Sequence, residues 1–335
     1  MAATVSALTM SAPQQVSAGS SNTSESPQQA VSGEDAVNAL NSVFGRHAKE
    51  RGSHAKGFCV KGEFVPTEKA SDETTVGLFR HKSIPVTGRF SIGGGNPKAS
   101  DKSRSVRGMA VRLYPDGEDM LDLVMISAPV FFAATPEQFV EFLKVRTPDP
   151  KTGEKNPKKI AAFNARNPNV MTHLNYLSKT PPPASYASTP YFSTHAFLID
   201  LAEGRSHAAR WHFEPVGGFV GLTQEQESHY PDTFLESELN ARLIDSSAEW
   251  TAYLQLAGPD DDVNDPSAEW AETRSSFIEV GHLKVTETIA QGSAEDCTPL
   301  VFDPNNLPDG INPTNDPILA LRRPAYSVSL SRRVQ

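Results

Sequence analysis

The sequence predicts an α+β protein in which helices surround an antiparallel β-barrel or sheet. Three observations support this fold class: short β-rich runs, turn signals of Gly, Pro and Asp between them, and helix-capping patterns at intervals along the chain. No internal repeat divides the 335 residues, so we expect one large domain behind a leader.

The leader is the segment of residues 1–31. It is rich in Ser, Ala and Gln, and no Lys or Arg precedes Arg46. A secretory signal would need a basic start and a longer apolar core than residues 2–10 provide. We therefore expect residues 1–31 to be disordered and residues 32–335 to form the folded domain. The cytoplasm is favoured as the compartment, and the periplasm is the alternative if the leader is processed.

The first ordered element is expected to be a helix that begins after Ser32. Ser32 with Asp35 three residues later resembles an N-terminal capping pair. Val37, Leu40 and Phe44 then recur at helical spacing, which predicts one apolar face.

The sequence then becomes strand-like. Pro115-Asp116-Gly117 is typical of a turn, as is Glu203-Gly204, so the runs on either side of each are predicted to form hairpins. The β-rich runs are residues 109–114, 121–126, 195–201, 210–213, 250–256 and 277–285.

Three further helices are predicted between and after the strands. Thr135-Pro136-Glu137-Gln138 combines a capping Thr with Pro at the first helical position. Residues 233–244 place leucines at every fourth position, which gives one apolar stripe. Asp316-Pro317 repeats the cap and proline pattern and starts a last helix.

The composition excludes several classes of partner. The net charge of −9 argues against nucleic acid or an anionic membrane, and we expect neither. No apolar stretch approaches the 18 or so residues of a spanning helix. Cys59 and Cys297 are the two cysteines, so no thiolate metal site or disulfide framework is indicated, and a single disulfide stays open.

His54 is the first candidate site residue. Arg51 and Lys56 lie within three residues of it and could keep it neutral at pH 7, as a general base must be. A histidine taken alone is more often structural.

Arg322 and Tyr326 form a second candidate. A tyrosine binds ferric iron as phenolate, although free tyrosine ionises only near pH 10. An arginine one helical turn earlier would stabilise the phenolate by its charge and by hydrogen bonding. Taken alone, such a pair is common by chance, and a surface cation–aromatic contact is its default interpretation.

Other residues could complete a haem pocket. Arg51 and Arg89 could each pair with a haem propionate, because a planar guanidinium matches a carboxylate. Phe131, Phe132 and Phe139 could line the porphyrin, and core packing is an equally good interpretation of them.

In this order and spacing, the motifs resemble those of the haem catalase superfamily, specifically its short branch, the catalase-related peroxidases. The resemblance extends from about Asn41 to Arg333. The matching stretches are Arg51-Gly52-Ser53-His54-Ala55-Lys56-Gly57 (the distal-histidine motif), Arg89-Phe90-Ser91, Pro129-Val130-Phe131-Phe132 with Phe139, residues 301–311, and Arg322-x-x-x-Tyr326 (the axial-ligand motif).

The resemblance implies a catalase-type antiparallel β-barrel with surrounding helices, and haem b as the cofactor. It implies that His54 is catalytic and that the Ser91 hydroxyl orients it. It also implies that the cofactor is bound by Arg51, Arg89, Phe131, Phe139, Arg322 and Tyr326, with Tyr326 as the axial ligand of the haem iron.

The chain departs from the family pattern beside the predicted distal histidine. Full catalases carry two asparagines there, and the first helps to hold peroxide. The matching positions here are Ile126 and Ser127, and Ala128 replaces a threonine. Because Ile126 cannot donate a hydrogen bond, a second peroxide is expected to bind weakly and to be oxidised slowly.

Two more departures lie at the end of the chain. Pro324 stands between Arg322 and Tyr326, where proline would kink or break a helix and disturb their i, i+4 geometry. Larger catalases continue with a wrapping segment and a helical domain, and some bind NADPH there. This chain ends nine residues after Tyr326, so we expect no NADPH and a monomer or small homo-oligomer.

The predicted function is that of a haem peroxidase. It would reduce hydrogen peroxide or organic hydroperoxides with a small organic electron donor, with weak or no catalase activity. Two alternatives remain: an isomerase or dehydratase of fatty-acid hydroperoxides, and a non-catalytic haem-binding protein.

Overall fold

A closed antiparallel β-barrel forms the centre of the protein. The computed structural model describes residues 1–2, 30–117 and 119–334, and the described part from Val31 onwards is one compact unit. Its strands are β1 Gly57–Pro66, β2 Ile84–Ile92, β3 Arg107–Leu113, β4 Leu121–Ile126, β5 Tyr191–Phe192, β6 Phe197–Asp200, β7 Ser206–Pro215, β8 Ala248–Leu256, β9 Ser276–Ile289 and β10 Ile311–Pro313.

Eight of these strands close the barrel. Neighbouring strands follow the order β7-β5-β4-β3-β2-β1-β9-β8, and β8 pairs with β7 to complete the ring. These pairings are all antiparallel. β6 and β10 extend the sheet from β7, so the eight closed strands have paired neighbours on both sides.

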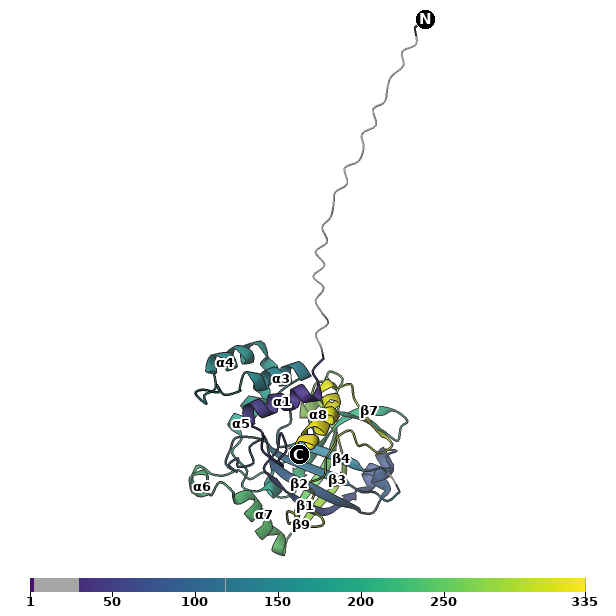
Figure 1. Cartoon of the computed structure of the whole chain (residues 1–335). Helices are drawn as coiled ribbons and strands as arrows, with labels where there is room; N and C mark the ends of the chain where they lie inside the picture. Colours follow the sequence, from purple (N-terminus) through teal and green to yellow (C-terminus); the bar gives the residue numbers. More distant parts are fainter. Residues whose placement is uncertain (3–29, 118, 335) are drawn as a thin grey trace. The chain divides into compact units, whose positions relative to one another are not determined.

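Helices cover the outside of the barrel. α1 packs against both α3 and α8, so the purple and yellow helices of Figure 1 lie together, whereas α2 and α7 pack against β9. The helices are α1 Gly33–Phe44, α2 Glu68–Glu73, α3 Pro136–Lys144, α4 Pro157–Arg166, α5 Pro168–Lys179, α6 Gln224–His229, α7 Phe234–Asp245 and α8 Pro317–Arg333, with 3₁₀ turns η1 Gly77–Arg80, η2 Tyr186–Ser188 and η3 Glu272–Arg274.

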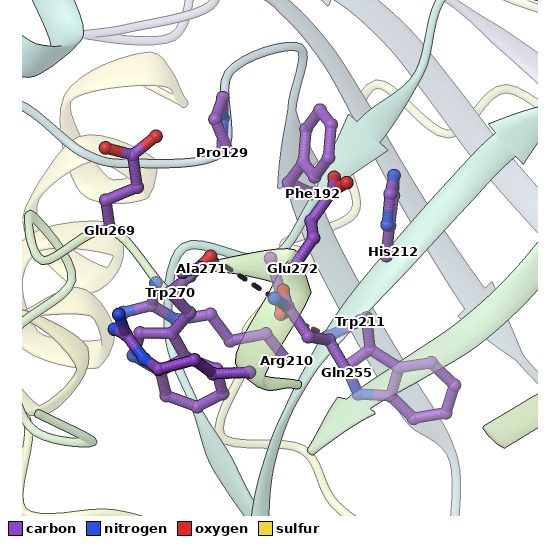
Figure 2. A pocket seen from close by; sticks show the side chains of 12 residues that line it. Pro129, Phe192, Arg210, Trp211, His212, Gln255, Glu269, Trp270, Ala271 and Glu272 are labelled. Atoms are coloured by element: carbon purple, nitrogen blue, oxygen red, sulfur yellow. Dashed lines mark hydrogen bonds between the residues drawn. The ribbon is translucent and has the colours of Figure 1, made fainter. Parts of the chain in front are cut away.

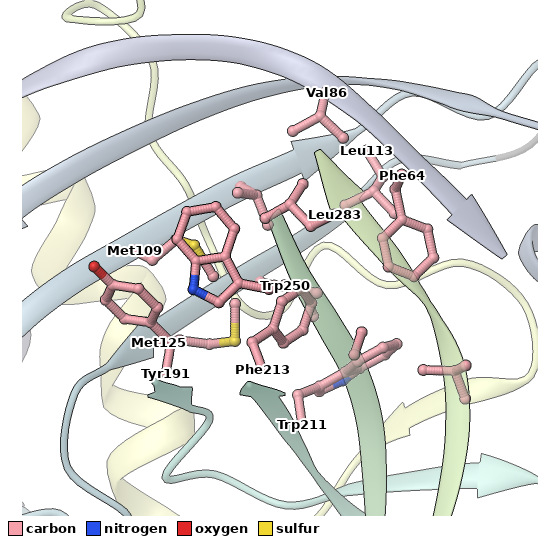
Figure 3. Packing of buried hydrophobic residues seen from close by; sticks show 14 of the residues in the cluster. Phe64, Val86, Met109, Leu113, Met125, Tyr191, Trp211, Phe213, Trp250 and Leu283 are labelled. Carbon is pink, nitrogen blue, oxygen red and sulfur yellow. The ribbon is translucent and has the colours of Figure 1, made fainter. Parts of the chain in front are cut away.

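Large apolar side chains fill the barrel interior. Trp211, Trp250 and Tyr191 are at most 1% exposed and lie among the residues drawn in Figure 3. Successive side chains of a strand point to opposite faces, so the neighbours of these residues along the strands point outward, toward the covering helices.

One series of outward-facing residues crosses five strands at the same level. Ser91, Gly108, Ile126, Phe192 and His212 are successive register partners on β2, β3, β4, β5 and β7. We call these five residues the outer row. Neighbouring strands lie about 5 Å apart, so the outer row connects points of the barrel surface that are far apart in the sequence.

The structure confirms the predicted barrel and most predicted elements. Ser32 and Asp35 form a capping box at the start of α1, Thr135 caps α3 and Asp316 caps α8. All six predicted β-rich runs overlap strands, namely β3, β4, β6, β7, β8 and β9. The predicted leader falls almost wholly on residues 3–29, outside the described residues.

The two cysteines are paired. A disulfide joins Cys59 on β1 to Cys297, in the segment after β9, and so decides the question that the sequence left open. Within the described residues, no helix combines the length and apolar character needed to cross a membrane.

Candidate functional site

His54 and Ser91 meet on the outer face of the barrel. The His54 Nδ1 atom and the Ser91 hydroxyl oxygen lie 2.9 Å apart, within hydrogen-bond distance. Gly108 makes room for the pair, because a Cβ there would lie 2.5 Å from the Ser91 oxygen and 2.6 Å from His54 Nδ1. The predicted catalytic pair is therefore in contact, and its catalytic role stays a prediction.

The backbone of His54 is held in an unusual conformation. Its φ angle is +54°, in the left-handed region that non-glycine residues seldom adopt. Arg89 donates hydrogen bonds to the carbonyls of His54 (2.9 Å) and Ala55 (3.0 Å). The side chain predicted to bind a propionate thus also fixes the loop that presents the histidine.

Burial keeps His54 neutral. Desolvation, followed by the charges of Arg89, Arg322 and Arg51, lowers the pKa of His54 to about 3. The prediction that Lys56 contributes was wrong: its ammonium donates to the Asp101 carboxylate at 2.6 Å, in an ion pair that compensates its charge.

Arg322 and Tyr326 keep their i, i+4 contact despite the proline between them. The Arg322 Nε atom donates to the Tyr326 hydroxyl oxygen at 2.7 Å, and its Nη2 atom donates to the same oxygen. α8 continues through Pro324 to Arg333. Gly33 of α1 packs against this proline, where a Cβ would lie 2.5 Å from the Pro324 carbonyl carbon. The expected loss of helical geometry does not occur.

Two residues that sequence reasoning missed extend this pair. Arg322 Nη1 lies 3.0 Å from His195 Nε2, and His195 Nδ1 lies 2.6 Å from the Asp316 carboxylate. Since a guanidinium can only donate, His195 Nε2 accepts and its Nδ1–H donates to Asp316. Desolvation lowers the pKa of His195, so the ring is neutral at pH 7. We call Asp316, His195, Arg322 and Tyr326 the proximal relay.

The two halves lie near enough for their charges to act on each other's pKa values. Arg322, from the proximal relay, is among the charges that lower the pKa of His54, and Tyr326 acts on the pKa of Arg51. The two halves are therefore neighbours in the fold, although His54 and Tyr326 are 272 positions apart in the chain.

Three arginines near His54 and Tyr326 form no ion pair with a carboxylate among the described residues. Desolvation, then the neighbouring charges of Arg89 and Arg333, lower the pKa of Arg51 to about 9, and burial lowers the pKa of Arg89 to about 10. Arg333 is 7% exposed, and its Nη1 atom lacks a hydrogen-bond partner among the described residues. A buried cation cluster of this kind fits a ligand with carboxylates, such as the two propionates of haem.

Aromatic residues form the wall predicted above the cofactor. The ring centroids of Phe131 and Phe132 lie 4.3 Å apart, and that of Phe139 on α3 lies 6.2 Å from Phe131. These rings pack on one another, so the structure brings the predicted wall together. Its contact with a porphyrin stays a prediction.

Ile126 lies next to the His54–Ser91 pair. It is the register partner of Gly108, whose own partner across the next strand is Ser91. The Ser127 hydroxyl accepts a hydrogen bond from the Arg107 backbone N–H at 2.8 Å. The apolar side chain predicted to replace the amide of full catalases therefore lies in the outer row.

Fold and site together define a catalase-type barrel protein. A family model described as Catalase matches residues 12–335, and this chain belongs to the catalase family. That family typically binds haem.

Two relatives are similar over most of their length. A catalase-related peroxidase of Synechococcus elongatus is 36% identical over 305 residues, which cover 91% of this chain and 89% of the relative. A catalase-related peroxidase of Mycolicibacterium paratuberculosis is 33% identical, over 90% of this chain and 94% of the relative. These names suggest an oxidoreductase that acts on peroxide.

Solved structures confirm the fold. A fungal catalase superposes with a TM-score of 0.77 at 22% identity, over 86% of this chain and 60% of that one. Catalase A of Saccharomyces cerevisiae gives 0.77 at 23% identity, over 86% and 62%. The present chain thus spans about three fifths of these larger proteins, and its described part has their barrel with surrounding helices.

Proposed function

We propose that this protein is a peroxidase that holds haem b and reduces hydrogen peroxide or organic hydroperoxides with a small organic electron donor. One observation carries the proposal: a half-buried, neutral, Ser91-bound His54 lies within reach of the charge of Arg322, which donates two hydrogen bonds to the Tyr326 oxygen. The names of the two relatives support the reaction class.

The cofactor would be held through residues already in place. Tyr326, oriented by Arg322, would supply an oxygen ligand to the haem iron, and Arg51, Arg89 and Arg333 would hold the propionates. Bound haem would supply the electron transfer that splits the peroxide O–O bond and then oxidises the donor. The proximal relay would hold Arg322 against the Tyr326 oxygen, because Arg322 is itself held by His195.

His54 would move the proton. Its Nε2 atom has no hydrogen bond within the described part of the chain, so it is available to take the proton from a hydroperoxide and return it to the leaving oxygen. Ser91 would keep the ring oriented. The overall reaction balances as ROOH plus two AH giving ROH, water and two A radicals, where AH is the donor.

Ile126 would limit the oxidation of a second peroxide molecule. Without an amide at this position, a second hydrogen peroxide molecule lacks a donor to hold it, so dismutation should be weak or absent. The same apolar side chain would suit organic hydroperoxides, which carry an alkyl group.

We also propose that the protein acts without nucleic acid or membrane, as a monomer or small homo-oligomer. The net charge of −9 supports the first part because it repels phosphate backbones and anionic lipid. Light scattering coupled to size-exclusion chromatography would test the second part.

The experiment compares optical spectra of the haem-reconstituted protein before and after stoichiometric peroxide, with and without a phenolic donor. His54→Ala should bind haem as the unaltered protein does, while its reaction with peroxide slows by about 10²–10⁴-fold, the usual contribution of a general acid–base group. The matched control is His229→Ala, since His229 is exposed on α6.

The outcomes separate the alternatives. Equal peroxide reactivity in His54→Ala and His229→Ala would remove His54 from the chemistry. Haem uptake without any reaction with peroxide would leave a haem-binding protein. Rearranged lipid in place of oxidised donor would indicate a hydroperoxide isomerase.

A further inference from the structure

We propose that a pocket at the far end of the outer row binds the electron donor, and that this donor is a small aromatic molecule bearing a positive charge. We call it the β7 pocket. The inference rests on the peroxidase function proposed above and names the substrate class of its second half-reaction.

The β7 pocket is large enough for such a molecule. Its volume is about 480 Å³, within the range of small-molecule sites. Its lining comes from β5, β7 and β8 and from the segment of residues 269–274, and Figure 2 shows these side chains.

The pocket adjoins the candidate site through the barrel itself. Phe192 and His212 line the pocket and belong to the outer row, in which Phe192 is the register partner of Ile126. Ser91 lies three strands from Phe192, or about 14 Å at the usual strand spacing. Pro129, at the start of the aromatic wall, also lines the pocket.

The walls of the pocket offer aromatic faces. The Phe192 and His212 rings are stacked, with centroids 4.4 Å apart and an interplanar angle of 29°. On the other side, the Arg210 guanidinium lies 4.2 Å from the centroid of the Trp270 ring. Flat apolar and cationic surfaces of this kind suit a planar ring.

Arg210 lines the pocket and has one N–H group without a hydrogen-bond acceptor among the described residues. Its two terminal nitrogens donate to the carbonyls of Ala268 and Asp265, at 2.8 and 2.9 Å. Its Nε atom is buried and has no hydrogen-bond partner among the residues that the structure describes. The side chain is 4% exposed, so bulk water reaches it poorly. Because this Nε atom has almost no accessible surface, a phenol oxygen of the bound donor would accept from its N–H only after the side chain shifts.

The rim carries negative charge without compensation. Glu269 and Glu272 are exposed, and their carboxylates have neither an ion pair nor a hydrogen bond within the described part of the chain. Figure 2 shows both carboxylates extending toward the side of the pocket where Pro129 and Phe192 lie. Arg274 at the same rim is 3.3 Å from Asp261, which offsets its charge.

His212 adds no free cation to the pocket. Its Nε2 atom lies 2.5 Å from the Glu214 carboxylate, an ion-pair distance that lacks hydrogen-bond geometry. The pocket therefore combines an aromatic interior, one buried N–H donor and two free carboxylates at its mouth. A phenol with an ammonium group matches all three features: its ring stacks inside, its oxygen accepts from Arg210, and its ammonium faces the rim.

Three donors with the same phenol ring test the charge preference. Tyramine is cationic, tyrosol is neutral and 4-hydroxyphenylacetate is anionic at pH 7. In the haem-loaded protein we expect kcat/KM to fall in that order, with tyramine about tenfold above 4-hydroxyphenylacetate. Each donor molecule loses one electron and its phenolic proton, and two are consumed per peroxide.

Changes to the rim should remove the preference. The double variant Glu269→Gln/Glu272→Gln should raise the KM for tyramine roughly three- to tenfold and bring the three donors close together, since each rim charge contributes modestly. The matched control is Glu225→Gln/Asp245→Asn, which removes the same charge from α6 and the end of α7. This control should keep the order of the donors.

A binding measurement supports the kinetic one. Calorimetric titration of tyramine into the protein should show weaker binding to the Glu269→Gln/Glu272→Gln variant than to the control variant. Ala271→Trp, which fills the pocket, should abolish binding. Circular dichroism of each variant would verify that it is folded.

Failure of this inference is distinguishable from failure of the proposed function. A protein that consumes peroxide with all three phenols equally, or in the reverse order, is a peroxidase without this donor site. The same conclusion follows if the rim and control variants behave alike. A protein that does not react with peroxide under any condition contradicts the proposed function itself.

Discussion

The two halves of the candidate site are held in opposite ways. On the distal side, His54 makes one side-chain hydrogen bond, to Ser91, from a backbone in the left-handed region. On the proximal side, Tyr326 is the end of four groups in series, anchored at Asp316. His54 thus keeps one ring nitrogen without a hydrogen bond among the described residues, whereas the Tyr326 oxygen accepts two hydrogen bonds.

The difference follows from what each half has to do. A group that moves a proton must change its protonation during every cycle, so it needs a free nitrogen and a neutral resting state. A group that holds a metal must keep its charge through the cycle, so fixed donors around it are an advantage. Three variants and one change of pH test this difference between the two halves.

Tyr326→Phe should have the largest effect. It removes the oxygen on which Arg322 converges and the proposed ligand, so haem uptake should fall at least about tenfold. Absorbance titration with haem would measure this, beside Tyr230→Phe as a control at an exposed tyrosine. Unchanged affinity in Tyr326→Phe would show that the iron is held elsewhere.

Asp316→Asn should have a smaller effect than Tyr326→Phe. Asparagine can still cap α8, but its amide N–H groups oppose the His195 Nδ1–H, so the relay is broken at its anchor. We expect a loss of about 1–3 kcal/mol in the free energy of unfolding, the range for a buried polar group left unpaired. Urea unfolding would measure it.

Asn156→Ala provides the comparison, because Asn156 caps α4 and has no link to the site. Asn156→Ala should lower the free energy of unfolding by only about 1 kcal/mol. Equal losses in the two variants would mean that Asp316 matters only as a helix cap.

Ile126→Asn should have a smaller effect, confined to the distal side. The amide would give a second peroxide a hydrogen-bond donor, so oxygen release from hydrogen peroxide should rise several-fold. Ile126→Leu keeps the side chain apolar and should leave dismutation low. An oxygen electrode would record both. No gain in Ile126→Asn would mean that another group limits dismutation.

Acid should have the most gradual effect. The pKa of His54 is about 3 in the folded protein, against about 6.5 in an unfolded chain. Between these values the unfolded chain binds a proton that the folded one does not. His54 therefore lowers the free energy of unfolding of the haem-free protein by up to about 1.4 kcal/mol per pH unit as pH falls below 6.5.

His54→Gln should flatten this decline, while His229→Gln, at an exposed histidine, should not. Urea unfolding at pH 7, 6 and 5 would show the slopes. An equal decline in the unaltered protein and His54→Gln would mean that this histidine is solvated in the haem-free state.

The sequence predicted the barrel better than the helices around it. Alternating β-rich runs and turn residues marked six strands, because periodicity and turn chemistry are local. β1, β2, β5 and β10 were missed, and β5 and β10 are too short to show a period. α4 and α5 were missed although Asn-Pro stands at the start of each, a cap and first-position signal that could have found them.

Within the site, the motifs predicted the residues that meet but not the ones that hold them. His54 and Ser91 could be paired by resemblance, whereas His195 looked like an ordinary strand residue and Asp316 like an ordinary cap. Their contact joins positions 121 residues apart, which the pairing of β10 with β6 brings together. The effect of Pro324 was misjudged because the support from Gly33 comes from a different helix.

The disulfide gives the chain an unusual covalent form. Cys59 and Cys297 are 238 positions apart, so most of the polypeptide lies inside one closed loop. Residues 150–156 are exposed within that loop, where a protease could reach them. One cut there would leave His54 on one fragment and Tyr326 on the other, still linked through sulfur. Such a nicked protein should migrate as a single band on a denaturing gel until a thiol reductant separates the two parts.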